Sequence, residues 1–205
     1  GIPYNYEKAI QIIKEGKTVF QDAGKVSYYN NGEKAERYFF NVTGMGFDAE
    51  VARKVNHDKD KGKDAGEMTY FRHIFTCLFG YNAVSTKFNL DGKEISANVF
   101  SMNVGICKYN GGGMMQLPKA DPSDGILDLT IIKKINPLKV ILNVNRLFDG
   151  TIEKISEVEL HQGKSIRIEA EIPTYIEVDG ESLGHSPFEF SIVQGGLKFI
   201  IAKTS

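Results

Sequence analysis

Two carboxylates flank a glycine at Asp179, Gly180 and Glu181, directly after a stretch of alternating polarity at residues 174–178. A hydroxyl that attacks a phosphoryl group needs a carboxylate within hydrogen-bonding reach to accept its proton, and a rigid strand end holds such a base well. The same three residues are also favourable hairpin-turn chemistry. From the residues alone, Glu181 is therefore either a general base or a turn residue.

A second stretch that packing alone would not choose is rich in glycine. It begins at Asn103 in an expected strand and continues to Gly111, Gly112 and Gly113. Consecutive glycines cost entropy to order, so they usually serve a tight turn or a surface that a ligand or another domain approaches. A flexible loop without function explains the run equally well.

Two aspartates follow the glycines. Asp121 and Asp124, with Pro122 and Ser123 between them, could offer carboxylate and backbone oxygens to a hard cation such as Mg²⁺. An ordinary Asp-Gly turn is the alternative. Earlier in the chain, a GMG sequence at residues 44–46 follows an expected strand, where it permits either a close backbone approach or a β-bulge.

Other features argue against several classes of protein. The formal net charge of −1 provides no basic field that would attract nucleic acid. A membrane-spanning helix needs about 18 consecutive apolar residues, and the sequence has no such run. Cys77 and Cys107 lie far apart without metal-ligand spacing, which favours a reduced, cytoplasmic setting. The sequence has no GxSxG nucleophile elbow, so a Ser-His-Asp hydrolase has little support. A metal-dependent hydrolase has little support either, because the four histidines show no metal-binding spacing. These histidines are His57, His73, His161 and His185.

The elements that must position these residues can be read from periodicity. Apolar spacings of three and four predict helices over residues 6–15 and 68–81, and a capped helix over 137–148. The charged stretch at residues 53–66 is interpreted as a solvated loop.

Alternation with a period of two predicts many short strands joined by glycine turns. The expected strands lie at residues 38–42, 86–90, 97–106, 126–132, 158–161, 165–170, 174–178, 188–192 and 197–202. We therefore expect a mainly β, α+β chain in which residues 1–205 form one domain, an antiparallel β-sandwich with two or three helical insertions.

Four sequence segments together carry a resemblance to a known family: FNVTGMGFDAEV, GEMTYFRH, NVGICKYNGGGMMQLPKADPSDGILDL and YIEVDGE. The chain resembles the diacylglycerol kinase, YegS-like and BmrU-like lipid kinase family over nearly its whole length. In that family these segments belong to the second domain, a β-sandwich that closes over a Rossmann-like ATP-binding domain. The family's GGDGT phosphate-binding motif is not in this sequence, and no initiator Met precedes Gly1. The resemblance thus implies the second domain of a two-domain lipid kinase, cut from a longer protein and inactive alone.

The resemblance also implies roles for particular residues. Glu181 is expected to be the general base toward the lipid hydroxyl, with Asp179 beside it. Asn103 and the run Gly111, Gly112 and Gly113 match positions that line the interdomain cleft. A structural Mg²⁺ is expected at Asp124 with the neighbourhood of Asp121 and Ile126, partly through backbone carbonyls. The Asp and Pro at positions 121 and 122 depart from many members, which leaves the metal geometry open.

The family resemblance further implies ATP and Mg²⁺ as cofactors. The partners expected are a lipid substrate and the chain's own N-terminal nucleotide-binding domain, with peripheral contact at the inner face of the membrane, a possible homodimer and no nucleic acid. Two alternatives stay open. The acceptor could be a sphingoid base, phosphatidylglycerol or NAD, or the chain could be a non-catalytic binding domain in which Glu181 is only a turn residue.

Overall fold

The computed structural model describes residues 2, 4–60 and 67–202, and the side chains of residues 59–71 lie outside what it describes. The described chain is mainly β. Its strands are β1 (Thr18–Asn30), β2 (Glu33–Phe39), β3 (Val42–Gly46), β4 (Val84–Leu90), β5 (Lys93–Gly105), β6 (Leu127–Lys133), β7 (Val158–Gly163), β8 (Ser165–Ala170), β9 (Tyr175–Val178) and β10 (Glu181–Ile200).

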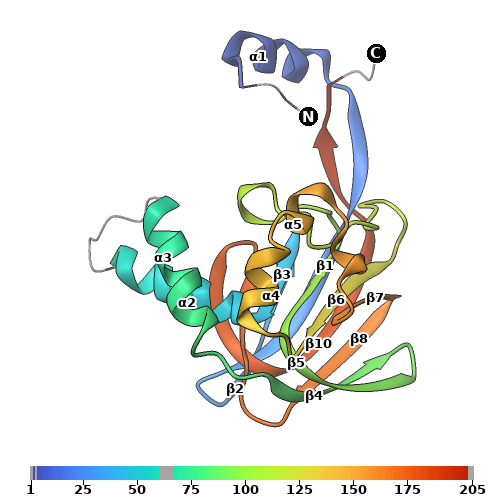
Figure 1. Cartoon of the computed structure of the whole chain (residues 1–205). Helices are drawn as coiled ribbons and strands as arrows, with labels where there is room; N and C mark the ends of the chain where they lie inside the picture. Colours follow the sequence, from blue (N-terminus) through green and yellow to red (C-terminus); the bar gives the residue numbers. More distant parts are fainter. Residues whose placement is uncertain (1, 3, 61–66, 203–205) are drawn as a thin grey trace.

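The sheet closes on itself because β10 pairs with strands on both of its sides. The ring runs β10, β8, β4, β5, β3, β9 and back to β10, while β1 with β2 and β6 with β7 extend it. Each pairing among these described strands is antiparallel. The expected antiparallel β-sandwich is confirmed, and its sheet closes on itself like a barrel (Figure 1).

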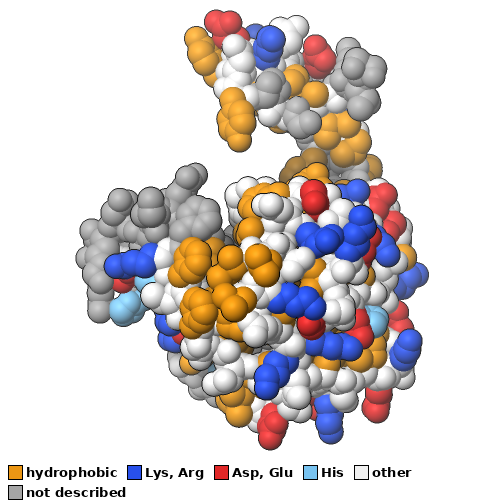
Figure 2. All heavy atoms as spheres, in the orientation of Figure 1, with side chains coloured by type: hydrophobic (Ala, Val, Ile, Leu, Met, Phe, Trp, Pro, Cys, Tyr) orange, Lys and Arg blue, Asp and Glu red, His pale blue; other side chains and the backbone are white. Residues whose placement is uncertain are grey.

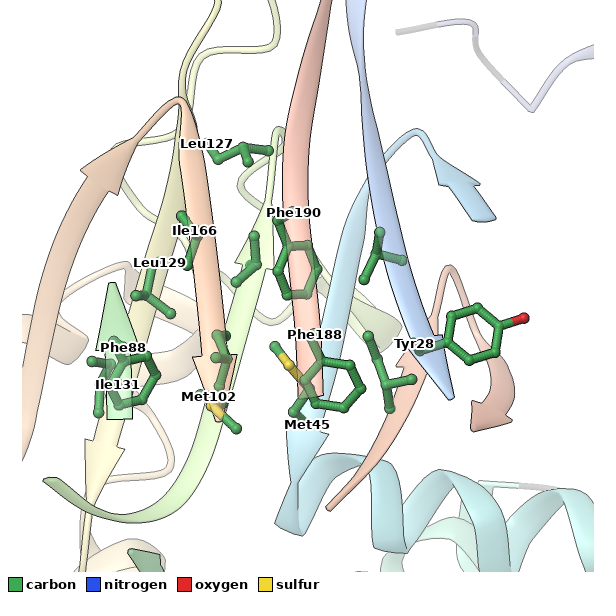
Figure 3. Close-up of a cluster of buried hydrophobic side chains, with 14 of the residues drawn as sticks. Tyr28, Met45, Phe88, Met102, Leu127, Leu129, Ile131, Ile166, Phe188 and Phe190 are labelled. Atoms are coloured by element: carbon green, nitrogen blue, oxygen red, sulfur yellow. The ribbon is translucent and has the colours of Figure 1, made fainter. Parts of the chain in front are cut away.

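The main core fills the inside of this closed sheet (Figure 3). Phe188 and Phe190 of β10 lie at its centre, and the Phe190 ring meets Phe39 edge to face at 6.2 Å. Met45 and Met102, which lie opposite each other on the paired strands β3 and β5, fill the space beside them. Full burial of one such side chain stabilises the fold by about 1.5–3 kcal/mol, so this cluster makes the barrel a rigid platform for the loops at its ends.

Helices cover one part of the barrel. They are α1 (Tyr6–Glu15), α2 (Phe47–Asp60), α3 (Glu67–Leu78), α4 (Pro137–Leu142) and α5 (Arg146–Asp149). The prediction of a loop over residues 53–66 is wrong for residues 53–60, which belong to α2. Phe47, Val51 and Val55 recur every four residues and pack on Cys77 and Phe100, so this apolar stripe outweighs the surrounding charges.

The predicted helix over residues 137–148 is two helices. The side-chain amide of Asn143 donates to the Lys139 carbonyl at 2.8 Å, which occupies an acceptor of the last turn, and α4 ends there. The predicted strands 188–192 and 197–202 are parts of one strand, β10. The predicted strand 38–42 is interrupted after Phe39, because the backbone N–H groups of the next residues turn to another partner.

An arm projects from the barrel at the N-terminal side (Figure 1). It consists of α1 and the paired ends of β1 and β10, where Thr18 lies opposite Ile200. The predicted helix at residues 6–15 is confirmed: the Asn5 side chain accepts the Lys8 N–H at 2.9 Å, and Gly16 caps the other end with a φ of 65°. No residue of α1 is buried, so its apolar side has no partner within the described chain.

Candidate functional site

Asp179 and Gly180 form the two-residue turn between β9 and β10. Their φ angles are 47° and 91°, which is the turn geometry that Asp-Gly favours in tight hairpins. Glu181 therefore emerges at the first position of β10, opposite Val178 of β9. The pairing of β9 with β10 therefore fixes the backbone position from which the Glu181 side chain extends.

The Asp179 carboxylate points back into the chain. It accepts the backbone N–H groups of Phe40, Asn41 and Val42 at 2.8, 3.1 and 3.2 Å, and the Asp179 N–H donates to the Val42 carbonyl. These contacts explain why β2 and β3 are separate strands. Asp179, which the resemblance placed beside the general base, therefore braces the turn with its side chain.

The same short segment touches the other candidate stretches. The Phe40 carbonyl accepts the side-chain amide of Gln21 at 2.8 Å, and the Asn41 carbonyl accepts the Ile106 N–H at 3.0 Å. Gln21 is followed by Asp22, a buried aspartate whose carboxylate accepts the N–H of Gly125 at 2.7 Å. The turn, the end of β5 and the acidic loop are thus brought together at the end of the barrel where β1 leaves for the arm.

The Glu181 carboxylate lies at the surface, with 63% of its side chain exposed. Its partner is Arg37 of β2, whose Nη2 lies 2.5 Å from Oε2. Because Arg37 is held in a regular strand pair with Val26, the ion pair restricts where the carboxylate can point. The Glu181 carboxylate is therefore accessible to another molecule, and its ion pair with Arg37 orients it.

A buried polar cluster lies beside the turn, around Gly44 of β3. The Asp48 Oδ2 accepts the side-chain amides of Asn103 at 3.1 Å and Gln116 at 2.9 Å. Glu177 of β9 lies opposite Gly44, and its Oε1 accepts the Gly180 N–H. A Cβ on Gly44 would stand 2.9 Å from the Glu177 Oε2 and 3.2 Å from the Asp48 Cβ, so the glycine of the GMG sequence makes room for these carboxyls.

The predicted glycine run lies outside this cluster but is connected to it. Residues Gly111–Gly113 form an exposed 3-10 turn, with Gly112 and Gly113 at positive φ. The Asn110 side chain accepts the Gly111 N–H and donates to Gln116, which in turn donates to Asp48. Asn103 is fully buried in this chain, so it reaches the glycine turn only through these contacts.

Burial governs the charge state of this cluster. It raises the pKa of Glu177 to about 7, against the lowering effect of the Gly180 N–H, and nearby Asp48 and Asp179 raise it further. Burial also raises the pKa of Asp48, although the amides of Asn103 and Gln116 oppose that shift. At pH values below about 7, the cluster therefore holds a proton.

The predicted metal loop is closed by local hydrogen bonds. The Asp121 Oδ1 accepts the N–H and the hydroxyl of Ser123, which lowers the pKa of Asp121, and the Asp124 Oδ1 accepts the Ile126 N–H at 3.0 Å. Burial raises the pKa of nearby Asp128 to about 6, and its Oδ2 has no hydrogen-bond partner among the described residues. Carboxylate and carbonyl oxygens suit Mg²⁺, and the unpartnered Oδ2 fits a cation nearby.

The geometry of the acidic loop is nevertheless not that of a complete protein cage. Within residues 4–58 and 72–202, no three His, Cys, Asp or Glu side chains converge as metal ligands would. A cation here would therefore rely on two carboxylates, a backbone carbonyl and water, as Mg²⁺ commonly does.

Sequence reasoning did not single out Arg37, Asp48, Gln116 or Glu177. Glu177 carried one usable signal, because a glutamate between Ile176 and Val178 is unusual in a strand that is buried on both sides. The other three depend on pairings between distant strands and loops, which periodicity does not reveal.

Comparison with known proteins identifies a family, curated relatives and solved structures that this chain resembles. A family model described as the YegS C-terminal NAD kinase beta sandwich-like domain matches residues 41–201. The diacylglycerol kinase of Mycobacterium tuberculosis (strain CDC 1551 / Oshkosh) is 29% identical over 203 residues, covering 98% of this chain and 63% of that protein. The probable lipid kinase YegS-like of Yersinia pestis (strain Pestoides F) is 29% identical over 193 residues, covering 94% and 60%.

A solved structure shows the same fold. The crystal structure of a diacylglycerol kinase from Bacillus anthracis strain Sterne matches with a TM-score of 0.66 at 20% identity, covering 99% of this chain and 61% of that chain. The chain thus spans 63% of the length of the mycobacterial relative and a similar share of the others.

Proposed function

Because the chain belongs to the family of YegS C-terminal NAD kinase beta sandwich-like domains, we propose that it supplies the acceptor side of an ATP- and Mg²⁺-dependent lipid kinase. Its curated relatives are named diacylglycerol kinase and YegS-like lipid kinase. The acceptor in this proposal is a lipid hydroxyl, and the transferred group is the γ-phosphoryl group of ATP.

The observation that carries the proposal is the bracing of the turn that presents Glu181. Asp179 fixes it to residues 40–42, and Glu177 fixes Gly180 from the inside. The other Asp-Gly hairpin, at Asp91 and Gly92, is braced in a similar way by Asn89 and by the backbone N–H groups of two distant residues. The turn at Asp179 differs because it is followed by an exposed carboxylate, that of Glu181. A general base does need this rigidity, because small displacements of a reacting group cost large factors in rate.

The chemistry of the step follows from the exposed carboxylate. Glu181 accepts the proton of the lipid hydroxyl while the hydroxyl oxygen forms a bond to the γ-phosphorus and the bond to ADP breaks, so that ADP leaves with the electron pair. Arg37 holds the carboxylate before the acceptor arrives. Glu181 is thus the catalytic residue contributed by this chain.

The acidic loop is the proposed Mg²⁺ position. Asp121 and Asp124 would hold the ion with the backbone carbonyl of Ile126, and Asp128 lies nearby with an unpartnered oxygen. When bound there, the ion would supply order to the loop and neutralise its carboxylates. The loop is already tied to the barrel by Asp22, which accepts N–H groups from both Gly125 and Gly195.

A nucleotide-binding domain is the proposed partner at the arm. The sequence contains no GGDGT motif, so ATP would be bound mainly outside this chain. The arm leaves the barrel at the end that carries the turn, and the apolar side of α1 is uncovered there. A domain seated on that side would face Glu181, as phosphoryl transfer between two domains requires.

A lipid substrate also requires contact with a membrane, for which one face of the domain offers a surface. Figure 2 shows hydrophobic side chains gathered over α4 and the neighbouring end of α3, bordered by Lys and Arg. We call this the α3–α4 patch; its exposed members are Phe75, Phe79, Leu138, Ile141, Leu142 and Val144. Apolar side chains with a cationic border suit the interface of an anionic membrane. No helix in the described ranges is long and apolar enough to cross a bilayer.

Phosphate transfer from labelled ATP by the intact protein tests the proposal. The acceptors would be diacylglycerol, phosphatidylglycerol, sphingosine and NAD, presented separately. We expect label in a lipid, and the labelled lipid identifies the acceptor. Label in NAD alone would replace the lipid by a nucleotide acceptor, and label in none of them, with ATP bound, would favour a non-catalytic binding domain.

A further inference from the structure

Glu177 is a buried carboxyl that the proposed proton transfer does not use. Only 5% of the residue is exposed, and it lies on β9 four positions before Glu181. Its Oε1 accepts the N–H of Gly180. In a two-residue turn this N–H has no partner on the opposite strand, so the carboxyl supplies the acceptor that the backbone lacks.

The surroundings of Glu177 contain negative charge and no cation that pairs with it among the described residues. Asp48 of α2 and Asp179 of the turn face it, and both disfavour its ionisation. On β10, Glu181 is turned to Arg37, and the His185 ring is held at the Ser186 carbonyl. On α2, Arg53 pairs with Glu50 and lies over the Tyr175 ring, and β3 (VTGMG) carries no titratable side chain.

The hydrogen bonds show which of the two carboxyls keeps its charge. Asp48 has two amide donors and lies in the first turn of α2, where the helix dipole also favours an anion. Glu177 accepts only backbone N–H groups, those of Gly180 and Gly44, and no side-chain donor of the described residues or helix dipole favours its charge. The proton therefore belongs to Glu177.

An unpartnered oxygen marks where that proton can point. The Asn103 Oδ1 is fully buried and accepts no hydrogen bond from the described residues. It and the Glu177 Oε2 lie 3.5 and 2.9 Å from the same point, the position that a Cβ of Gly44 would take. If Glu177 is protonated on Oε2, its hydroxyl supplies a hydrogen-bond donor on the side where the Asn103 Oδ1 lacks one.

We propose that Glu177, as a neutral carboxylic acid beside the Asp48 carboxylate, is a positioning residue that holds Gly180 and through it the Glu181 carboxylate. Ionised Glu177 would add a second negative charge to the buried cluster, and its repulsion from Asp48 and from Asp179 of the turn would loosen the turn even though the carboxylate still accepts the Gly180 N–H. This role deepens the proposed function, and it rests on that function only where kinetics are concerned.

The protonation is tested in this chain without any turnover. Carbon-13 NMR of the glutamate carboxyls should show Glu177 titrating near pH 7, far above its ordinary value of 4.5. Between those values Glu177 holds more of its proton in the folded chain than in the unfolded chain, so the contribution of Glu177 to stability falls as pH rises from 4.5 to 7. The variant Glu177→Gln should show a shallower fall in stability over this pH range, because Asp128 and Asp48 still contribute to it, whereas Glu33→Gln should keep the full decline. A Glu177 midpoint near 4.5 would overturn the proposal.

The positioning role is tested by the kinetics of the intact protein. Glu177→Met, which removes the acceptor for Gly180, should lower kcat by roughly tenfold or more with the KM for ATP unchanged, because a small displacement of the base is costly. Glu177→Gln should rescue kcat relative to Glu177→Met and remove the loss of activity as pH rises through about 7. Equal kcat in all three proteins, or a wild-type pH profile in Glu177→Gln, would overturn the role.

These two tests separate the inference from the proposed function. If the intact protein transfers phosphate to no acceptor, the lipid kinase fails, and the NMR midpoint still decides where the proton lies. If it transfers phosphate and Glu177 titrates near 4.5, the lipid kinase stands and the inference about Glu177 fails.

Discussion

At the scale of single residues, two carboxylates of one turn have opposite surroundings. The Asp179 carboxylate accepts three backbone N–H groups, whereas the Glu181 carboxylate lies at the surface with one arginine. The first arrangement satisfies most of the acceptor sites of a carboxylate and leaves little capacity for a substrate. The single ion pair of Glu181 leaves acceptor sites of its carboxylate free to take up a proton, which is why the base is assigned to Glu181.

Asp179→Asn tests the bracing role. Asparagine keeps the preference for positive φ in the turn but loses the charge that strengthens the three hydrogen bonds. We expect the free energy of unfolding to fall by about 1 kcal/mol in urea denaturation. The conservative control is Asp91→Asn in the other Asp-Gly turn, where two N–H groups are accepted and a smaller loss is expected. An unchanged midpoint in Asp179→Asn would show that the turn does not need this brace.

The sequence allowed part of this site to be predicted. The DGE turn, the glycine run and the two aspartates stand out because their residue types break the alternation around them. Arg37, Asp48 and Gln116 do not, because arginine, aspartate and glutamine are ordinary surface residues until the fold brings them to a particular carboxyl.

At the scale of elements, the site depends on β3, β9 and α2 packing closely around Gly44. The strands pair directly at Gly44 and Glu177, and α2 begins immediately after β3, which places Asp48 over the same point. Three elements can meet here only because the residue between them has no side chain.

Gly44→Ala should therefore be destabilising. Its Cβ would approach the Glu177 Oε2 to 2.9 Å and the Asp48 side chain to 3.2 Å, and the paired backbone leaves little room to relax. We expect a loss of about 1–3 kcal/mol in the free energy of unfolding. Gly111→Ala is the matched control, because nothing lies within 4 Å of its Cβ. Equal stability of the two variants would contradict the close packing described for the cluster.

Most elements were predictable because their periodicity is strong, and the failures have physical causes. Phe47, Val51 and Val55 form a stripe only one residue wide, which the charges of residues 53–60 obscure in the sequence. The break after Phe39 is imposed by Asp179, which lies 139 positions away from Phe40 in the sequence. Long-range hydrogen bonds of this kind leave no local signal.

At the scale of the whole molecule, the barrel separates two surfaces with different proposed partners. The arm and the Glu181 turn lie at the end where β1 leaves the sheet, and the α3–α4 patch lies over the helices on one side (Figures 1 and 2). A lipid that enters from the membrane must reach the end that carries the turn.

Leu142→Asp tests the membrane contact. Leu142 is 82% exposed in the α3–α4 patch, so a charge there should not disturb the core. We expect binding to vesicles that contain anionic lipid to weaken by about tenfold or more, because the side chain can no longer enter the apolar layer. Ile172→Asp, at a residue 57% exposed in the loop between β8 and β9, is the control and should bind as the wild type does. An equal loss of vesicle binding in both variants would show that the α3–α4 patch is not the membrane-binding surface.

The most direct test is the rate of phosphate transfer to the lipid acceptor by the intact protein in which Glu181 is replaced by glutamine. Glutamine keeps the size of the side chain but cannot accept the proton, so kcat should fall by about 10²–10⁴-fold while ATP affinity is unchanged. Glu33→Gln, an exposed change at the start of β2, should leave the rate unaltered. A rate in Glu181→Gln within roughly twofold of the wild-type rate would contradict the assignment of Glu181 as the base.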